Sequence, residues 1–305
     1  MLHPLSHHPI IMNTTTMNNH TNTTHQPTLR RAFRLLGLPL GLAIAALSAQ
    51  AATIEPTTWY SSGPADTPVE GGGLQFDTKT SSGIQNILTY FDPVSLSAPG
   101  DSLNLSLTFS AKIHYAATGT PFRFALYDSG GKQISDNGLG QNNSAFNAYR
   151  GYRVGVGIKE SSSDNAFELR PRSANETALG GGTSHPAALG GYTGATSSNL
   201  ASDTLYNASY TITRTDANTL AISISITGGA LSDYNGSWSV SSTSDPFYTT
   251  FDTAAIMMNS NGLFDSLTLY NVSITSTSSI PEPATVALLL GGATLGFVGW
   301  RRRRL

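Results

Sequence analysis

Apolar and polar side chains alternate along several stretches in the middle of the chain, which is the pattern of half-buried β-strands. In the longest stretch, "LNLSLTFSAKIHY", every second residue from Leu103 to Tyr115 is apolar or aromatic. The same period of two runs through three shorter stretches and begins a fourth. We therefore predict strands over residues 103–115, 122–126, 152–158, 220–226 and 267–274.

The residues between these stretches have the composition of turns and loops. "DSGGK" at 128–132 and "TDANT" at 215–219 separate strands by the spacing expected of hairpins. In "LFDSLTLYNVSI" the apolar phase shifts at Tyr270–Asn271, which predicts a β-bulge. Residues 171–203 form a long insertion rich in Gly, Ser and Thr, and loops of this length are usually functional or irregular.

These features predict an all-β module over residues 52–280, folded as one antiparallel β-sandwich of the jelly-roll type. No run of residues has the clean period of an amphipathic helix, and no internal repeat has a fixed period. Another sandwich topology, a β-helix and a barrel are the alternatives.

The N-terminal region has the composite pattern of a secretory signal peptide over residues 29–51. Three arginines precede an apolar stretch at 35–47, which is too short to span a bilayer stably. Ala49 and Ala51 supply the small residues that signal peptidase needs, which predicts cleavage after Ala51. We expect residues 1–28 to be a disordered leader, part of which lies upstream of the true start if that start is Met12 or Met17.

The C-terminal region combines three features in a fixed order. Pro281, Glu282 and Pro283 form a rigid extended element. The uncharged stretch 284–300 follows, close to the shortest helix that spans a bilayer. It ends in four arginines that would stay on the cytoplasmic side and stop translocation: Arg301, Arg302, Arg303 and Arg304.

This arrangement resembles the PEP-CTERM sorting signal of bacteria, over residues 281–305. The resemblance implies recognition by an exosortase, an integral-membrane transpeptidase related to cysteine proteases. It also implies transient anchoring in the inner membrane of a Gram-negative-type envelope, and then delivery to the cell surface or extracellular matrix, often beside exopolysaccharide. It implies nothing about the chemistry of residues 52–280.

Composition narrows the classes of partner and chemistry. The chain has no cysteine, which excludes disulfides, zinc–thiolate sites and a cysteine nucleophile. Residues 52–280 carry 10 lysines and arginines against 18 aspartates and glutamates, a formal charge of −8. An acidic module does not favour nucleic acid, whose binding depends on neutralised phosphates. The same field would repel anionic polymers.

The middle of the chain resembles the concanavalin A-like lectin and glucanase jelly roll, including laminin-G-like modules. The resemblance depends on "FRFALYDSGGK", on "YRGYRVGVGIKE" and on the order "YTITRTDANTLAISISI", "FDTAAIM", "FDSLTLYNVSI". Glycoside hydrolases of that fold carry Glu-x-Asp-x-x-Glu on a strand, and this sequence has no such motif. Glu160 and Glu168 share a neighbourhood in the sequence, but they flank a predicted turn.

Other catalytic patterns are also missing from the sequence. His114 and His185 are the only histidines of the exported module, and no Gly-x-Ser-x-Gly elbow occurs. We therefore expect no enzyme activity and no cofactor. Asp128, Asp136 and Asn137 offer oxygen ligands for calcium, but no loop has a regular calcium-binding pattern, so calcium stays unassigned.

Carbohydrate binding is the functional hypothesis that the residues favour. The faces opposite the predicted core carry Arg123 and Tyr127 on one strand and Arg153 on another, with glycines that flatten the surface. A groove of these residues with Tyr149 and Trp238 would suit a neutral polysaccharide. The simpler interpretation is an ordinary outer face.

Three hypotheses follow for the exported module. It binds or organises exopolysaccharide in a biofilm matrix without catalysis, it is a glycan-active hydrolase or lyase, or it is a purely structural matrix protein. The expected processing partners are signal peptidase, after Sec export, and an exosortase. Nucleic acid is not an expected partner.

Overall fold

The structure of this chain is a computed structural model that describes part of the sequence between Gln50 and Ser279. The described residues are 50–62, 67–69, 73–77, 84–113, 122–138, 140, 142–157, 166–173, 175–180, 187–190, 192–195, 200–259 and 264–279. They belong to one compact unit, Ala46–Leu305. The predicted leader 1–28, nearly all of the predicted signal peptide and the predicted sorting segment 281–305 lie outside the described residues.

Nine of the described strands form the larger sheet, and every pairing in it is antiparallel. Its order is β10 (Thr193–Gly194), β13 (Leu231–Ser241), β12 (Thr219–Gly228), β11 (Tyr206–Arg214), β6 (Ser102–Ile113), β15 (Phe264–Ser278), β4 (Gly73–Asp77) and β3 (Thr67–Val69). The ninth strand, β1 (Gln50–Ile54), pairs with β15 beyond the end of β4.

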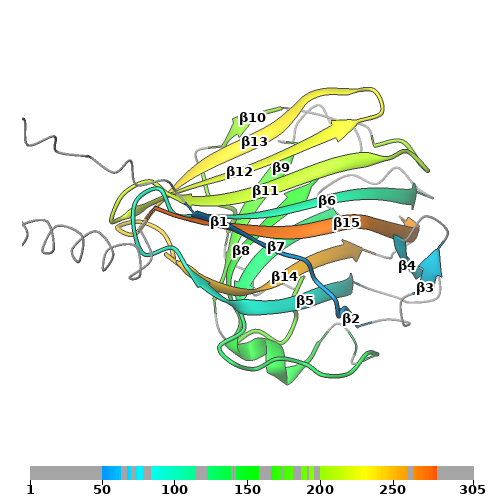
Figure 1. Cartoon of the computed structure of the whole chain (residues 1–305), viewed down its shortest axis with the longest axis horizontal. Coiled ribbons are helices and arrows are strands. Elements are labelled where there is room, and N and C mark those ends of the chain that lie inside the picture. Colours follow the sequence, from blue (N-terminus) through cyan, green and yellow to red (C-terminus); the bar gives the residue numbers. More distant parts are fainter. Residues whose placement is uncertain are drawn as a thin grey trace, which may run out of the picture. The chain divides into compact units, whose positions relative to one another are not determined.

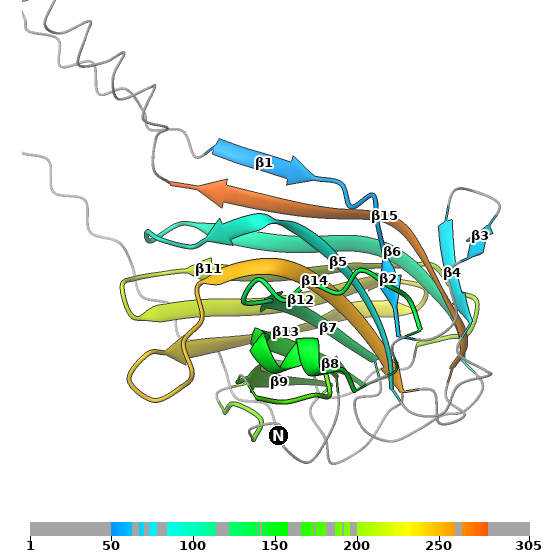
Figure 2. The same cartoon turned by 90° about the horizontal axis from the view of Figure 1, so that it is seen from below.

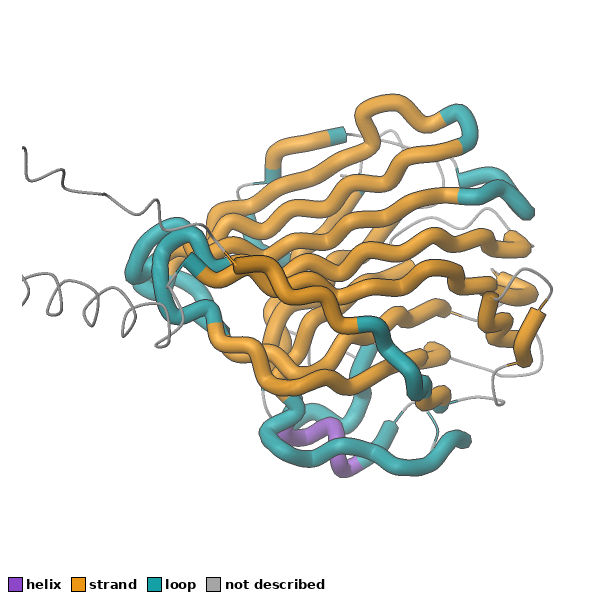
Figure 3. The backbone as a smooth tube through the Cα atoms, viewed as in Figure 1, coloured by secondary structure: helices purple, strands orange, loops and turns teal. Residues whose placement is uncertain are grey.

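Six described strands form the second sheet, again with antiparallel pairings. Its order is β2 (Tyr60–Ser61), β5 (Ile84–Ser95), β14 (Thr250–Asn259), β7 (Phe122–Asp128), β8 (Arg150–Val156) and β9 (Phe167–Arg172). Figures 1 and 2 show the two sheets in two views, and Figure 3 shows one 3₁₀ turn, η1 (Ser144–Ala148), beside the described strands. The predicted antiparallel β-sandwich is confirmed.

The main core lies between the two sheets and is built from the alternating positions of the sequence. On β6, Leu103, Leu105, Leu107 and Phe109 are all at most 2% exposed. The ring of Phe109 lies 5.0 Å, centroid to centroid, from that of Phe122 on the opposite sheet. Truncating one such phenylalanine to alanine typically costs about 3–5 kcal/mol of stability, so this interface holds the sandwich together.

A second apolar cluster covers the outer face of the six-stranded sheet. Ala125, Tyr127 and Met257 on the strands pack against Phe146, Tyr149 and Leu179 from connecting segments. The strands β7, β8 and β14 are therefore buried on both faces, and in β14 the apolar residues form the continuous run Ala254–Met258.

The connection between β7 and β8 differs from the prediction. The two strands pair as expected, but residues 129–149 lie between them, so "DSGGK" is only the first turn of a long loop. That loop contains η1 and contributes Ile134 and Phe146 to the second cluster. The prediction of a tight hairpin there was wrong, because burial of these apolar side chains holds the longer excursion on the sheet.

The other predicted strands agree with the structure over the residues that it describes. The hairpin at 215–219 joins β11 to β12. The ladder between β15 and β6 is irregular between Tyr270 and Ser273, where Asn271 has a φ of 47°, so the predicted bulge is confirmed. The predicted insertion 171–203 includes regular structure, since Pro171 and Arg172 end β9 and β10 lies within it.

Candidate functional site

Four of the five residues predicted to bind glycan lie on one face of the protein. Arg123 and Tyr127 are on β7, Arg153 is on β8 and Tyr149 directly precedes β8. The register pairs Ala125 with Arg153, which places these side chains over the outer face of the six-stranded sheet. The structure therefore brings these four together, on the face opposite the main core.

The face is not open, however. Tyr127 and Tyr149 are 0% exposed and Arg153 is 5% exposed. Arg123 Nη1 donates to the carbonyl oxygen of Gly180 at 2.6 Å, and Arg153 Nη1 donates to the same oxygen. The expectation of an accessible groove at these residues was wrong, because the chain segment 175–180 lies over them.

Glycine and arginine chemistry together explain how this segment packs so closely. A side chain at Gly180 would place its Cβ only 2.6 Å from Met257 Sδ, so only glycine fits there without a shift. Arg172 Nη2 donates to the carbonyl oxygen of Glu176 at 2.6 Å, and Arg172 Nη1 donates to that of Tyr149. The guanidinium groups therefore fasten the covering segment to the sheet.

Burial lowers the pKa of all three of these arginines. Burial, with the nearby charge of Arg153, lowers the pKa of Arg123 to about 10. Burial likewise lowers the pKa of Arg153 and of Arg172. A pKa of about 10 leaves Arg123 protonated at neutral pH, so it binds the Gly180 carbonyl as a cation.

Trp238 is separate from this group. It lies on β13 in the nine-stranded sheet, is 4% exposed and belongs to the main core. Its ring is 5.3 Å from that of Tyr192. The prediction for Trp238 was wrong, and the sequence contained the signal, since Trp238 is in phase with the buried Tyr234 and Val240 on the same strand.

The residues considered for metal binding serve local structure. Asn137 Oδ1 accepts from the Ser61 backbone N at 2.7 Å, and Asp128 Oδ1 accepts from the Gly130 backbone N at 2.8 Å. Within the described ranges, no group of three His, Cys, Asp or Glu side chains could hold a metal ion. Glu168 pairs with Arg170 at 2.5 Å.

Other predicted features fall where the structure gives no description. These are His114, Glu160, His185, Ala49, the motif Pro281–Pro283, the apolar stretch 284–300 and Arg301–Arg304. Ala51 is described, as the second residue of β1. Among the residues that the structure describes, no helix has the length and apolar character to cross a membrane.

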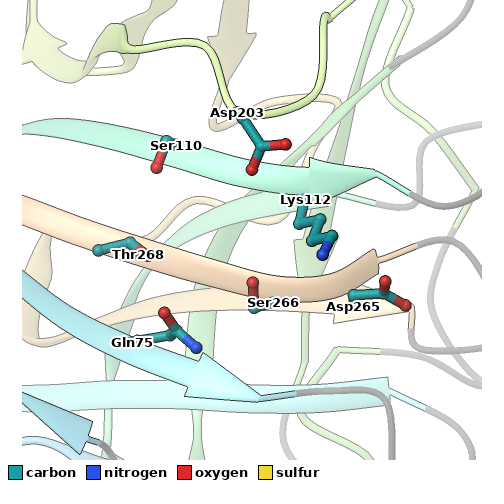
Figure 4. Close-up of a pocket in the computed structure, with 7 residues that line it drawn as sticks. All are labelled: Gln75, Ser110, Lys112, Asp203, Asp265, Ser266 and Thr268. Carbon is teal, nitrogen blue, oxygen red and sulfur yellow. The ribbon is translucent and has the colours of Figure 1, made fainter. Parts of the chain in front are cut away.

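Among the described residues, a polar pocket on the nine-stranded sheet is a candidate for ligand binding. Its volume is about 350 Å³, and strands that are distant in sequence meet there (Figure 4). Thr268 of β15 pairs with Ser110 of β6 on one side and with Gln75 of β4 on the other. The full lining is Gln75, Ser110, Lys112, Asp203, Asp265, Ser266 and Thr268.

The two aspartates of the pocket lie at irregular points of the backbone. Asp265 lies at a register shift of the β15–β6 ladder, between the partners Phe264 and Ser266, and bulges of this kind redirect a side chain. Asp203 has a φ of 56°, and its backbone N donates to the Ala111 carbonyl at 2.9 Å. In Figure 4 the Lys112 side chain lies between those of Asp203 and Asp265.

An aromatic ring adjoins the pocket. Tyr270 follows Thr268 by two residues on β15 and is half-buried. A Cβ at Gly73 would come within 2.6 Å of Tyr270 Cε1, so the ring lies directly against the β4 backbone. The pocket therefore combines hydroxyl, amide, ammonium and carboxylate groups with a neighbouring ring. Such a set can donate to and accept from a polyhydroxylated ligand.

The face beyond the pocket is rich in uncharged polar side chains. Asn104 Nδ2 donates to Ser209 Oγ and to Thr211 Oγ1, each at 2.7 Å, across β6 and β11. Thr108 Oγ1 donates to Asn207 Oδ1 at 2.8 Å. This face presents hydroxyls and amides at the spacing of the strands. The sequence had suggested an open, glycine-rich face on the strands β7 and β8 of the six-stranded sheet. That face is covered in the structure, and the open polar face lies on the nine-stranded sheet instead.

A model of the PEP-CTERM protein-sorting motif matches residues 279–304. The resemblance of the C-terminal region to that signal is thereby confirmed. The chain is an exported protein that passes through the membrane and is sorted to the cell surface by an exosortase. No curated protein matches the sequence.

Several solved lectin-like structures are similar to this chain at low identity. Lectin II from Ulex europaeus is 10% identical to this chain, with a TM-score of 0.44, and the match covers 75% of this chain and 98% of the lectin chain. Peanut lectin is 11% identical, covers 75% and 97%, and has a TM-score of 0.38. Arcelin-5, a lectin-like defense protein from Phaseolus vulgaris, is 10% identical, covers 75% and 98%, and has a TM-score of 0.42. At such TM-scores the likeness carries no argument about ligands.

Proposed function

We propose that this exported, exosortase-sorted protein is a non-catalytic module that binds neutral polysaccharide of the extracellular or biofilm matrix. Its ligand occupies the polar pocket on the nine-stranded sheet and continues over Tyr270. The observation that carries this proposal is the convergence of Gln75, Lys112 and Thr268 from three strands on one pocket. Polar groups fixed on strands can bind sugar hydroxyls with little loss of side-chain freedom.

The route to the surface belongs to the same proposal. The Sec pathway exports the chain in a Gram-negative-type cell, and signal peptidase cuts after Ala51. The C-terminal segment then holds the protein in the inner membrane until an exosortase processes it. Neutral ligands fit the formal charge of −8 over residues 52–280, which repels polyanions.

The test is binding of the purified mature module, residues 52–280, to an array of neutral glycans. We expect Lys112→Met and Thr268→Val to weaken binding about tenfold or more. Each replacement removes a hydrogen-bonding group while keeping the side chain at about the same size. The matched controls are Lys132→Met, an exposed lysine in the β7–β8 loop, and Thr227→Val, an exposed threonine of β12. Absence of binding to every neutral glycan would leave a purely structural matrix role.

Hydrolysis is the second candidate, favoured by the two carboxylates that line the same pocket. Glycoside hydrolases use a pair of carboxyl groups on the two sides of the scissile bond. Release of reducing sugar from a bound polysaccharide, lost in both Asp203→Asn and Asp265→Asn, would replace the binding proposal with this one. Binding without release supports the non-catalytic module.

A further inference from the structure

One buried carboxylate fastens Ser279, which lies two residues before Pro281 of the sorting motif. Asp101 is 3% exposed. Its Oδ1 atom accepts from the backbone N of Ser279 at 2.9 Å. Its Oδ2 atom accepts from the backbone N atoms of Ser97 and Ala98, each at 2.8 Å. A carboxylate that accepts several backbone N–H groups is a strong, directional anchor. We call the contact between Asp101 and Ser279 the clasp.

The surroundings of the clasp are equally fixed. The Ser279 hydroxyl lies 2.9 Å from Asp101 Oδ1 and 2.9 Å from the Pro99 carbonyl, so its single proton has two acceptors. Gly100 has a φ of 94°, and a Cβ there would lie 3.3 Å from Ser279 Cβ. Arg214 Nη1 donates to the Leu96 carbonyl at 2.9 Å, which ties the start of this turn to β11.

The sorting motif begins only two residues after the clasp. Pro281 can lie at most about 7 Å along the chain from Ser279, because an extended residue spans about 3.3–3.6 Å. The residues before Ser279 belong to β15, where Thr277 pairs with both β6 and β1. The folded module therefore reaches almost to the motif, and β15 leaves no loose linker upstream of Ser279.

One recurring mode of peptide recognition takes the peptide as an extended strand, through main-chain hydrogen bonds over several residues. A site that holds Pro281–Pro283 in this way would also need backbone groups just upstream. Those of Ser279 and Thr277 are already bonded within the module. Binding to the processing enzyme and the clasp therefore compete for the same stretch of chain.

We propose that Asp101 is a positioning residue that controls exosortase processing. The clasp keeps the end of β15 on the folded module, and the sorting motif enters the enzyme only after Ser279 detaches from Asp101. Processing is thereby coupled to opening of the β15 end, and the clasp sets how often that end is open.

Pulse–chase labelling of the full chain in cells that contain the exosortase tests this proposal, with conversion of membrane-bound precursor to mature protein as the measured rate. We expect Asp101→Asn to raise that rate about tenfold, and Ser279→Ala to raise it by a smaller factor because the backbone N–H is retained. A six-residue Gly/Ser spacer between Ser279 and Ile280 supplies slack without changing the fold. It should accelerate processing to the same extent, and adding Asp101→Asn to it should change nothing further.

Asp216→Asn is the matched control, because this exposed aspartate lies in the 215–218 hairpin and bonds its own turn through Asn218. It should be processed at the rate of the unaltered chain. An unchanged or slower rate in either the spacer variant or Ser279→Ala overturns the proposal. If Asp101→Asn fails to fold, the processing rate of the spacer variant still tests the proposal, because that variant leaves Asp101 and Ser279 unchanged.

Discussion

Gln50 and Ser278 are Cα partners at the end of the antiparallel ladder between β1 and β15. The first is next to the predicted signal-peptidase site and the second is three residues before Pro281. The two segments that direct export and sorting therefore join the module at the same end of one ladder. Cleavage after Ala51 would remove two of the five pairs and leave Ala52–Ile54 on β15.

The shortened β1 should still stabilise the mature module. We expect a chain that begins at Glu55 to be about 1–2 kcal/mol less stable than one that begins at Ala52, because the packing of Ile54 and three strand pairs are lost. A domain of this size should lose about 2–4 °C in melting temperature per kcal/mol. Thermal denaturation measures the difference.

Exposure of the β15 edge has a second consequence. Unpaired backbone groups at a sheet edge promote association between chains, so the chain that begins at Glu55 should associate more strongly in size-exclusion chromatography. A chain that begins at Gln50 is the control and should stay monomeric. If the chains that begin at Gln50, Ala52 and Glu55 have equal melting temperatures and elute at the same volume, β1 contributes neither to stability nor to protection of the β15 edge.

The buried arginines should hold the segment 175–180 on the six-stranded sheet. We expect Arg153→Met to lower the free energy of unfolding by about 1–2 kcal/mol, from loss of a charged hydrogen bond to Gly180. The loss is limited because Arg153 Nε is buried with no partner among the described residues, so the side chain already bears a desolvation cost. Urea denaturation measures the change.

Hydrogen exchange distinguishes this role from a general loss of stability. In Arg153→Met, amide exchange should accelerate first in residues 175–180, before the strands exchange. Arg150→Met is the matched control, because Arg150 is an exposed residue of the same strand and its replacement should cost less than about 0.5 kcal/mol. Equal effects of the two replacements would contradict the role given to Arg153.

The sequence predicted the inner face of the sandwich well because the period of a strand is a local property. Leu103, Leu105 and Leu107 alternate with polar residues, and all three are buried. The sequence did not predict that the outer face of the six-stranded sheet is covered, because the covering side chains, such as Phe146 and Leu179, lie far along the chain from the residues they cover. The run "AAIMM" in β14 was the available signal, since a strand exposed on one face would alternate there.

The pocket could not be predicted from local patterns. Gln75, Lys112 and Asp265 lie on three strands, and only the sheet order β6–β15–β4 brings them together. The sorting motif is the opposite case, because its three parts are contiguous from Pro281 to the last arginine. Export and sorting were therefore readable from the sequence, whereas the candidate pocket required the fold.

The clasp should make stability depend on pH in the acidic range. Burial alone would raise the pKa of Asp101, but the N–H groups of Ser279, Ala98 and Ser97 hold it below its usual value. The contribution of the carboxylate is therefore fully present above the unfolded pKa of about 3.9 and is lost as the pH falls through the lower folded pKa. The stability gap between the unaltered protein and Asp101→Asn should be constant near pH 6 and close as the pH falls below about 4. Urea denaturation at several pH values measures it, and a gap that does not change with pH would contradict this account.

The contact between Gly73 and Tyr270 gives the most selective test of the pocket. Gly73 has no positive φ, so alanine fits its backbone, but the new Cβ would come within 2.6 Å of Tyr270 Cε1 and 2.9 Å of Thr268 Cγ2. The tyrosine ring must move, and we expect Gly73→Ala to weaken glycan binding about tenfold while the melting temperature falls by only a few degrees. Gly190→Ala is the matched control, because a Cβ there meets nothing within 4 Å. The measurement is titration of both variants with the glycan that the unaltered module binds. An unchanged affinity in Gly73→Ala would mean that the ligand does not contact the Tyr270 ring. A weaker affinity in Gly190→Ala would mean that the binding site lies elsewhere.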